Sequence, residues 1–200
     1  MHRILITGFD AFGEETVNPA QKILQLVSPP ENTELIRLEV PTAFGLSAEV
    51  VEKAMEDCHP HAVLCIGQAG GRSAVTPERV AINIMDASIP DNQGQMPQDL
   101  PVIPGGENAL FATVPVKKMV AAIREAGIPS QLSYSAGTFV CNQLFYRVLS
   151  LCREKYPATA AGFIHVPFLT EQTVTRPQYP SLSLPQMVTA IEAALSVLAE

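Results

Sequence analysis

Charged residues are scarce in this chain of 200 amino acids. Asp, Glu, Lys and Arg make up 16% of it, against about 25% in an average soluble protein. Basic residues are the scarcer kind, since 13 Lys and Arg face 20 Asp and Glu, which gives a net charge of −7. Proteins that bind nucleic acids or anionic membrane surfaces present a basic face. We therefore expect neither nucleic acid nor a membrane among the partners of this protein.

The sequence also lacks a long uninterrupted apolar run. Prolines and charged residues interrupt every candidate window before it reaches the length of about 20 residues that a membrane helix needs. The first apolar run, Ile4–Thr7, is too short for a signal peptide, and Gly8-Phe9-Asp10 follows it instead of a small-residue cleavage site. We expect a cytoplasmic protein.

Cysteine is sparse as well. The four cysteines are Cys58, Cys65, Cys141 and Cys152, and no two of them form a CxxC pair. This pattern indicates free thiols in a reducing compartment, so each cysteine is either part of the core or a nucleophile. The Cys58-His59-Pro60-His61 stretch clusters only three potential ligands around a proline, which favours a turn between two elements over a metal site.

Hydrophobic residues, by contrast, are plentiful at 47%, and a chain of this length is typical of one domain with one core, here residues 1–200. Apolar runs predict strands at Ile4–Thr7, Leu35–Val40, Ala62–Ile66, Val80–Met85, Gln131–Tyr134 and Ala161–Val166. Helical signals predict five helices: from Pro19, capped by Asn18, to about Val27; from a Ser47 cap to about Cys58; from Pro115 to Gly127; from Cys141 to Lys155; and from Ser183, where Gln186 completes a capping box.

Strands that alternate with helices predict an α/β fold with a mostly parallel sheet that is covered on both faces. Such sheets bind ligands outside the carboxyl ends of their strands. The segments at that edge are Gly8–Asn18, Gly67–Glu78, Ser135–Cys141 and the residues from His165 onward. Two long proline-rich stretches, Asp86–Ala112 and Pro167–Leu182, flank this edge. Because proline restrains a loop, we expect ordered walls there.

Cys141 is the strongest candidate nucleophile. It lies in the first turn of a predicted helix, after the small-residue segment Ser135-Ala136-Gly137. There the helix dipole and unpaired backbone N–H groups are expected to lower the pKa of a thiol and to stabilise an oxyanion. The alternative is that Cys141 only begins the apolar stripe of its helix. Cys65 and Cys152 fit the core better.

A thiol nucleophile needs a base and a residue that orients the base. His165 ends an apolar strand at the expected site edge, although a hydrogen-bonded core histidine is the alternative. Glu78 opens another apolar strand, where a carboxylate is suited to orient an imidazole. A surface ion pair with Arg72 or Arg79 is the alternative role for Glu78.

Four ordered segments closely resemble the pyroglutamyl peptidase I family, cysteine peptidases that remove an N-terminal 5-oxoproline residue from peptides. The segments are Gly8–Gly13 with Asn18-Pro19, Gly67–Asn83, Ser133–Asn142 and Gly162–Gln172. The resemblance implies a single-domain open α/β/α sandwich with a twisted sheet, no metal or organic cofactor, and a homotetramer. It further implies that Cys141 is the nucleophile of a thioester mechanism, His165 the general base and acid, and Glu78 the residue that orients His165.

The resemblance also implies the substrate pocket. A 5-oxoproline ring is an uncharged lactam, so apolar walls and a few hydrogen bonds suit it. By resemblance, Phe9 and Phe12 sandwich the ring from a loop, Phe139 closes the back, Thr42 and Ile89 line the pocket, and Gln68 and Val140 offer backbone groups. The alternative role for Phe9 and Phe12 is ordinary core packing.

Two places depart from the family pattern, and one of them is Ala11-Phe12-Gly13-Glu14, where the family often carries Pro-Phe-Gly-Gly. Ser88 occupies a position where the family usually carries Arg, and Arg72 or Arg79 is a candidate replacement for the missing cation. Two other functions remain open at this stage. One is a binder of pyroglutamyl peptides with little or no activity, and the other is a nucleoside phosphorylase, suggested by the Gly67–Gly71 loop.

Overall fold

A five-stranded sheet lies at the centre of the molecule in a computed structural model that describes residues 2–199. Its strands are β1 (His2–Phe9), β2 (Thr33–Val40), β3 (Ala62–Gln68), β7 (Ala160–Val166) and β4 (Thr76–Pro77), in the order β2-β1-β3-β7-β4. The first four are parallel, and β4 is antiparallel to β7. Every residue of β3 is buried, as expected for a parallel strand with both faces covered.

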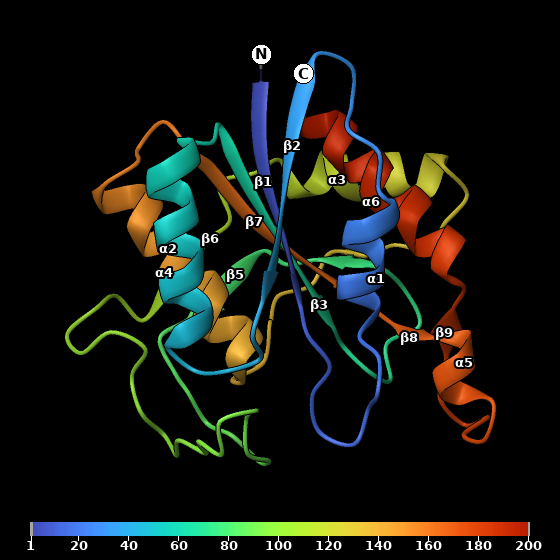
Figure 1. Cartoon of the computed structure of the whole chain (residues 1–200), viewed down its shortest axis with the longest axis horizontal. Helices are drawn as coiled ribbons and strands as arrows, with labels where there is room; N and C mark the ends of the chain where they lie inside the picture. The colour runs from blue at the N-terminus through green and yellow to red at the C-terminus, as the bar shows by residue number, and fades with distance from the viewer. Residues whose placement is uncertain (1, 200) are drawn as a thin grey trace.

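Helices cover both faces of this sheet (Figure 1). On one face lie α1 (Pro19–Leu26), α3 (Val116–Glu125) and α6 (Leu184–Ala199); on the other lie α2 (Leu46–Cys58) and α4 (Val140–Glu154). The predicted stripe of α3 is buried at Val116, Met119, Val120 and Ile123. The α/β/α sandwich and the mostly parallel sheet are therefore confirmed.

Of two predicted helix caps, Asn18 and Ser47, the structure contains only the first. The Asn18 cap is confirmed, because its Oδ1 accepts a hydrogen bond of 3.0 Å from Ala20 N. The Ser47 cap is wrong: α2 begins at Leu46 after Gly45, and the Ser47 hydroxyl is buried and hydrogen bonds to Gln143 Oε1 at 3.4 Å. The turn before α2 needs a positive φ of 77°, which glycine adopts without strain.

The prediction of a strand at Gln131–Tyr134 is wrong. This segment meets residues 75–79 only through isolated bridges, such as Glu78 with Ser133, and Tyr134 is exposed. The predicted strand Val80–Met85 is shorter, since β5 (Val80–Ile82) pairs with β6 (Ala109–Phe111) in a separate two-stranded sheet. The run of apolar residues there reflects packing against α4 rather than membership of the central sheet.

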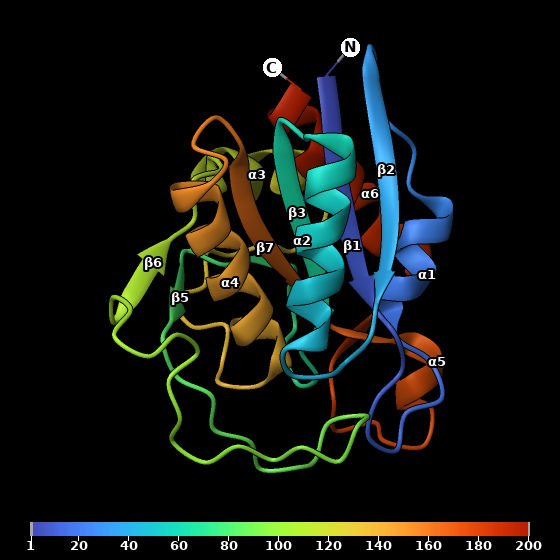
Figure 2. The same ribbon diagram turned by 60° about the vertical axis from the view of Figure 1, so that its left-hand side comes forward.

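The two proline-rich stretches run along the carboxyl ends of the parallel strands (Figures 1 and 2). Hydrogen bonds hold the first in place, including Met85 N to Leu100 O at 2.7 Å and Ile103 N to Asn83 Oδ1 at 2.8 Å. The second contains β8 (Phe168–Leu169), α5 (Thr170–Thr173) and β9 (Ser181–Leu182), which the sequence did not predict. Among residues 2–199, no helix is long and apolar enough to cross a lipid bilayer.

Candidate active site

Cys141 is the second residue of α4, at the carboxyl-end edge of the sheet. The residue before this helix, Phe139, is extended, and no side chain in the described part of the chain caps the start of α4. The first backbone N–H groups of a helix have no partner inside the helix. The amides around Cys141 are therefore available to a negatively charged oxygen.

Gly67 brings Cys141 close to the sheet. A Cβ atom at Gly67 would lie 2.8 Å from Cys141 Sγ and 2.9 Å from Phe163 Cζ, so only glycine leaves room for the sulfur. In the β3–β7 register, Gly67 is the partner of His165. The thiol thus lies beside the strand end that carries the predicted base.

His165 and Glu78 form a buried pair. His165 Nδ1 and Glu78 Oε1 are 2.7 Å apart, and the two side chains are 4% and 0% exposed. A carboxylate can only accept a hydrogen bond, so Nδ1 of His165 carries the proton. Nε2 of a neutral His165 ring is then a base. The structure brings together the three predicted catalytic residues, from α4, β7 and the end of β4.

Burial has different consequences for the pKa values of His165 and Glu78. Burial lowers the pKa of His165 despite the opposing effect of Glu78. Burial alone would raise the pKa of Glu78, but hydrogen bonding to His165 and the charge of Arg72 outweigh it and lower that pKa. Both groups therefore hold the state that a base and its orienting anion need at neutral pH: a neutral imidazole and a carboxylate.

The expectation of a low pKa for Cys141 is wrong. Burial, together with the negative charge of Glu78, raises the pKa of the Cys141 thiol to about 12. The Cys141 sulfur packs beside Gly67 of β3, and the loss of hydration there outweighs the effect of the helix N-terminus. Cys141 is therefore a thiol at neutral pH, and its proton must be removed as it reacts.

Phe9 is not in a loop, contrary to the expectation. It is the last residue of β1, it is 1% exposed, and its ring lies 6.4 Å from that of Phe163. Phe12 and Phe139 do face each other, with ring centroids 6.0 Å apart, and Phe44 packs edge-on against Phe139 at 5.3 Å. Phe12 and Phe139 therefore form an aromatic wall, while Phe9 lies in the core beside Phe163.

The other predicted pocket residues gather along the same edge. Thr42 is buried and bonded to Asp10 through its backbone N–H, at 2.7 Å. Ile89 is 42% exposed beside Gly13, so the loops that carry Phe12 and Ile89 are neighbours. Val140 is buried at the start of α4, and Gln68 ends β3.

Gln172, which was not among the predicted site residues, also lies at this edge. Its Nε2 donates to Gln68 Oε1 at 2.9 Å and to Glu15 Oε2 at 2.9 Å, while Glu15 also pairs with Arg176 at 2.7 Å. This network joins the loop after β1 to the end of β3 and to α5. The only signal in the sequence was the position of Gln172 within a segment that follows His165.

Arg72 and Arg79, the candidate replacements for a cation at position 88, both interact with other side chains. Ser88 is exposed. The guanidinium of Arg72 bonds to Glu78 at 2.6 Å, and that of Arg79 lies over the ring of Phe111, 5.2 Å from its centroid. Glu78 therefore does form an ion pair with Arg72, but as a buried carboxylate that also holds His165.

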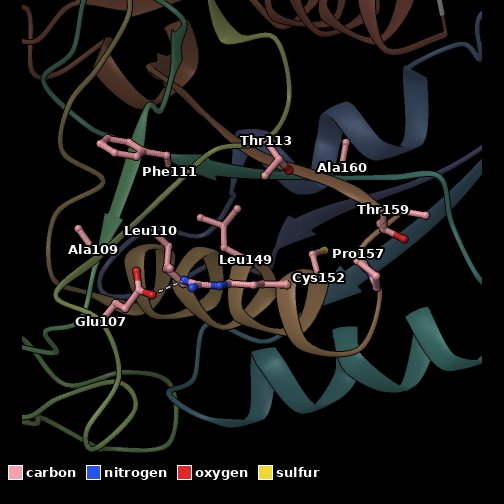
Figure 3. A pocket seen from close by; sticks show the side chains of 12 residues that line it. Glu107, Ala109, Leu110, Phe111, Thr113, Leu149, Cys152, Pro157, Thr159 and Ala160 are labelled. Carbon is pink, nitrogen blue, oxygen red and sulfur yellow. Dashed lines mark hydrogen bonds and ion pairs between the residues drawn. The ribbon is translucent and has the colours of Figure 1, made fainter.

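A cavity of about 680 Å³ lies on another part of the molecule (Figure 3). It is bounded by β6, the second half of α4 and the start of β7, and its lining includes Leu110, Phe111, Leu149 and Cys152. None of the residues that line it is a predicted site residue. The candidate site at the sheet edge is therefore identified from the chemistry of its side chains and not from the size of a cavity.

Comparisons with known proteins show which family and which solved structures the chain is similar to. The model of the family described as pyroglutamyl peptidase matches residues 2–200. A pyrrolidone-carboxylate peptidase of Streptococcus suis is 48% identical over 99% of this chain and 93% of its own length, and one of Lactobacillus johnsonii is 49% identical with the same coverage. The crystal structure of pyroglutamyl peptidase I from Bacillus amyloliquefaciens is 42% identical, covers 100% of this chain and 96% of its own, and has a TM-score of 0.96.

Proposed function

The chain belongs to the pyroglutamyl peptidase family of cysteine peptidases, and we propose that it hydrolyses the amide bond after an N-terminal pyroglutamyl residue through a thioester on Cys141. One observation carries the proposal. A buried His165–Glu78 pair, 2.7 Å apart, lies at the strand end beside which the Cys141 sulfur packs. A nucleophile, a base and an oriented anion are the set that acyl transfer requires.

The first half of the reaction forms the thioester. The Cys141 proton moves to Nε2 of His165 while the sulfur attacks the pyroglutamyl carbonyl carbon. This concerted transfer suits a thiol whose pKa burial raises to about 12, because no free thiolate has to exist beforehand. Backbone N–H groups at the uncapped start of α4 hold the oxyanion. The C–N bond then breaks, and the imidazolium of His165 gives its proton to the departing amine.

The second half releases pyroglutamate. His165, neutral again, takes a proton from water as the water oxygen attacks the thioester carbon, and it returns that proton to the Cys141 sulfur as the C–S bond breaks. Glu78 stabilises each transient imidazolium through its hydrogen bond to Nδ1. It stays ionised throughout, in keeping with its lowered pKa, which its bonds to His165 and Arg72 maintain against the effect of burial.

The proposed pocket for the lactam ring is bounded by the aromatic wall of Phe12 and Phe139, and the predicted contact of Phe9 with the ring would come from the buried end of β1. Thr42 and Ile89 complete the sides, and the backbone of Gln68 and Val140 serves the lactam N–H and carbonyl. Phe12 and Phe139 are only half-buried, so a ring can reach them. A prolyl residue has the same shape but carries a charged amine, which such an apolar site would bury without a partner.

The test compares a chromogenic pyroglutamyl amide with its prolyl analogue. We expect turnover of the first, rejection of the second, and loss of activity in Cys141→Ser and His165→Ala. Near-normal turnover by purified Cys141→Ser would overturn the mechanism. Binding of pyroglutamyl peptides without turnover would instead make this protein a binder.

We further propose that the protein is cytoplasmic, requires no metal or organic cofactor, and acts as a homotetramer. Its free cysteines agree with a reducing compartment. Activity that persists in the presence of a chelator, and a mass of four chains in analytical ultracentrifugation, are the expected results.

A further inference from the structure

Arg72, in the loop after β3, connects three segments of the site. Its Nη1 donates to Glu78 Oε1 at 2.6 Å and to Thr76 Oγ1 at 2.5 Å, and its Nη2 donates to Ser135 O at 2.9 Å. Ser135 belongs to the segment that leads to Cys141. A planar guanidinium can make several directed hydrogen bonds at once, which an ammonium cannot do in the same geometry.

Arg72 and His165 share a single carboxylate oxygen. Both the 2.6 Å contact of Arg72 and the 2.7 Å contact of His165 end on Glu78 Oε1. The side chain of Arg72 is 27% exposed, whereas that of Glu78 is 0% exposed, so Arg72 covers the buried carboxylate from the solvent side. The imidazolium that forms during the reaction must therefore share the Glu78 anion with a permanent cation.

We propose that Arg72 is a positioning residue of the reaction, which fixes the Glu78 carboxylate toward His165 and holds the segment that leads to Cys141 against it. The proposal rests on the proposed function, since it assigns Arg72 a part in the step that His165 performs. The side chain of Arg72 hydrogen bonds to Thr76, Glu78 and Ser135. It acts through the position of Glu78 and through its own positive charge.

The consequence for pH dependence has a definite sign. Burial lowers the pKa of His165, Glu78 opposes this, and the positive charge of Arg72 lowers it further. Besides these two charges, the titratable group that reaches this strand end from the packed helix is Cys141 on α4, which is neutral. Loss of the Arg72 charge therefore raises the pKa of His165. Because the base must be neutral to accept the thiol proton, the acid limb of kcat/KM moves to higher pH.

The experiment uses the full-length enzyme and a chromogenic pyroglutamyl amide, with kcat and KM measured across pH. In Arg72→Met we expect kcat to fall by up to about 100-fold, since a small misplacement of a catalytic group costs that much, with KM little changed and the acid limb at higher pH. In Arg72→Lys the charge remains, so we expect the acid limb near its normal pH and a smaller loss of kcat. Arg79→Met is the matched control and should keep both properties.

Two further results make the test decisive. Glu78→Gln should move the acid limb the opposite way, to lower pH, because Glu78 raises the pKa of His165. A wild-type kcat and pH profile in Arg72→Met would overturn the proposal. Equal losses in the Met and Lys variants with an unmoved acid limb would show a purely structural role and overturn it as well. Failure of the proposed function looks different, because the wild-type enzyme would then be inactive or Cys141→Ser would remain active.

Discussion

At the scale of single residues, the candidate site depends on a glycine, Gly67. Gly67 carries no Cβ, and the Cys141 sulfur and the Phe163 ring fill the space in which one would lie. A contact below 3 Å between a carbon and a sulfur or ring carbon forces one of them to move. Phe163 is fully buried, whereas Cys141 is a partly exposed residue at the start of α4, so we expect the thiol to move.

Gly67→Ala is therefore expected to displace the thiol from His165 and to lower kcat/KM by about 100-fold, the cost of a misplacement of about 1 Å. The measurement is kcat/KM on the pyroglutamyl amide together with the melting temperature. Gly162→Ala is the matched control, because a Cβ there also meets a side chain, Val114 at 2.3 Å, but on a part of β7 away from His165. Both variants should have a lower melting temperature than the wild type. Equal kcat/KM in the two variants would contradict a specific role for Gly67.

At the scale of elements, one buried carboxylate fixes a wall of the site. Asp91 lies in the loop Asp86–Ala112 and is 6% exposed. Its Oδ1 accepts from Gln93 N and Gln95 N at 2.9 and 2.8 Å, and its Oδ2 accepts from Phe44 N at 2.8 Å. Since Phe44 packs against Phe139, this carboxylate connects the loop with the aromatic wall. Hydrogen bonds, in addition to proline, order this loop.

Asp91→Asn is expected to lower the free energy of unfolding by about 1–3 kcal/mol, because a side-chain amide replaces one acceptor oxygen with a donor and leaves a buried N–H unpaired. KM should rise as the wall loosens. Urea unfolding and KM on the pyroglutamyl amide measure these effects. Asp99→Asn makes the same change of charge at an exposed position of the same loop and should leave both values near those of the wild type. If the two variants unfold at the same urea concentration, Asp91 does not order the loop.

At the scale of the whole molecule, folding lowers the pKa of two histidines, which makes the stability depend on pH. Burial lowers the pKa of His2, and the neighbouring His61 lowers it further. The two rings are stacked with centroids 4.6 Å apart, and His61 Nδ1 accepts a hydrogen bond of 3.0 Å from Arg3 N. His165 shifts in the same direction because of its burial. The folded protein therefore takes up protons less readily than the unfolded chain, in which histidine has a pKa of about 6.5.

It follows that stability falls as the pH drops below about 6.5, and it continues to fall as the pH nears the lower folded pKa values. The lowered pKa of Glu78, maintained by His165 and Arg72 against burial, adds a loss of the same sign at more acidic pH. We expect His2→Gln to flatten the decline of the melting temperature between pH 7 and 5. His59→Asn, at an exposed turn position, is the control. An unchanged slope in His2→Gln would show that the His2–His61 stack does not contribute.

By itself, the sequence determined the layers of this protein and the sheet edge at which its candidate site lies. The spacing of apolar residues and the helix caps are properties of short segments of sequence. They therefore predicted the helix start at Asn18 and four strands of the sheet, at Ile4–Thr7, Leu35–Val40, Ala62–Ile66 and Ala161–Val166. The edge where Cys141 and His165 lie was also predictable, because parallel strands end on one side of a sheet. The four motifs added the family.

Only the tertiary structure decided how those residues act on one another. The contact between His165 and Glu78 joins positions 87 residues apart, and it exists because the short β4 pairs antiparallel to β7. The same packing buries Cys141 beside Gly67, which reverses the pKa shift that a helix start alone would produce. It also places Phe9 in the core and Arg72 on Glu78. Desolvation and shared hydrogen bonds arise between segments, so no local pattern of residues encodes them.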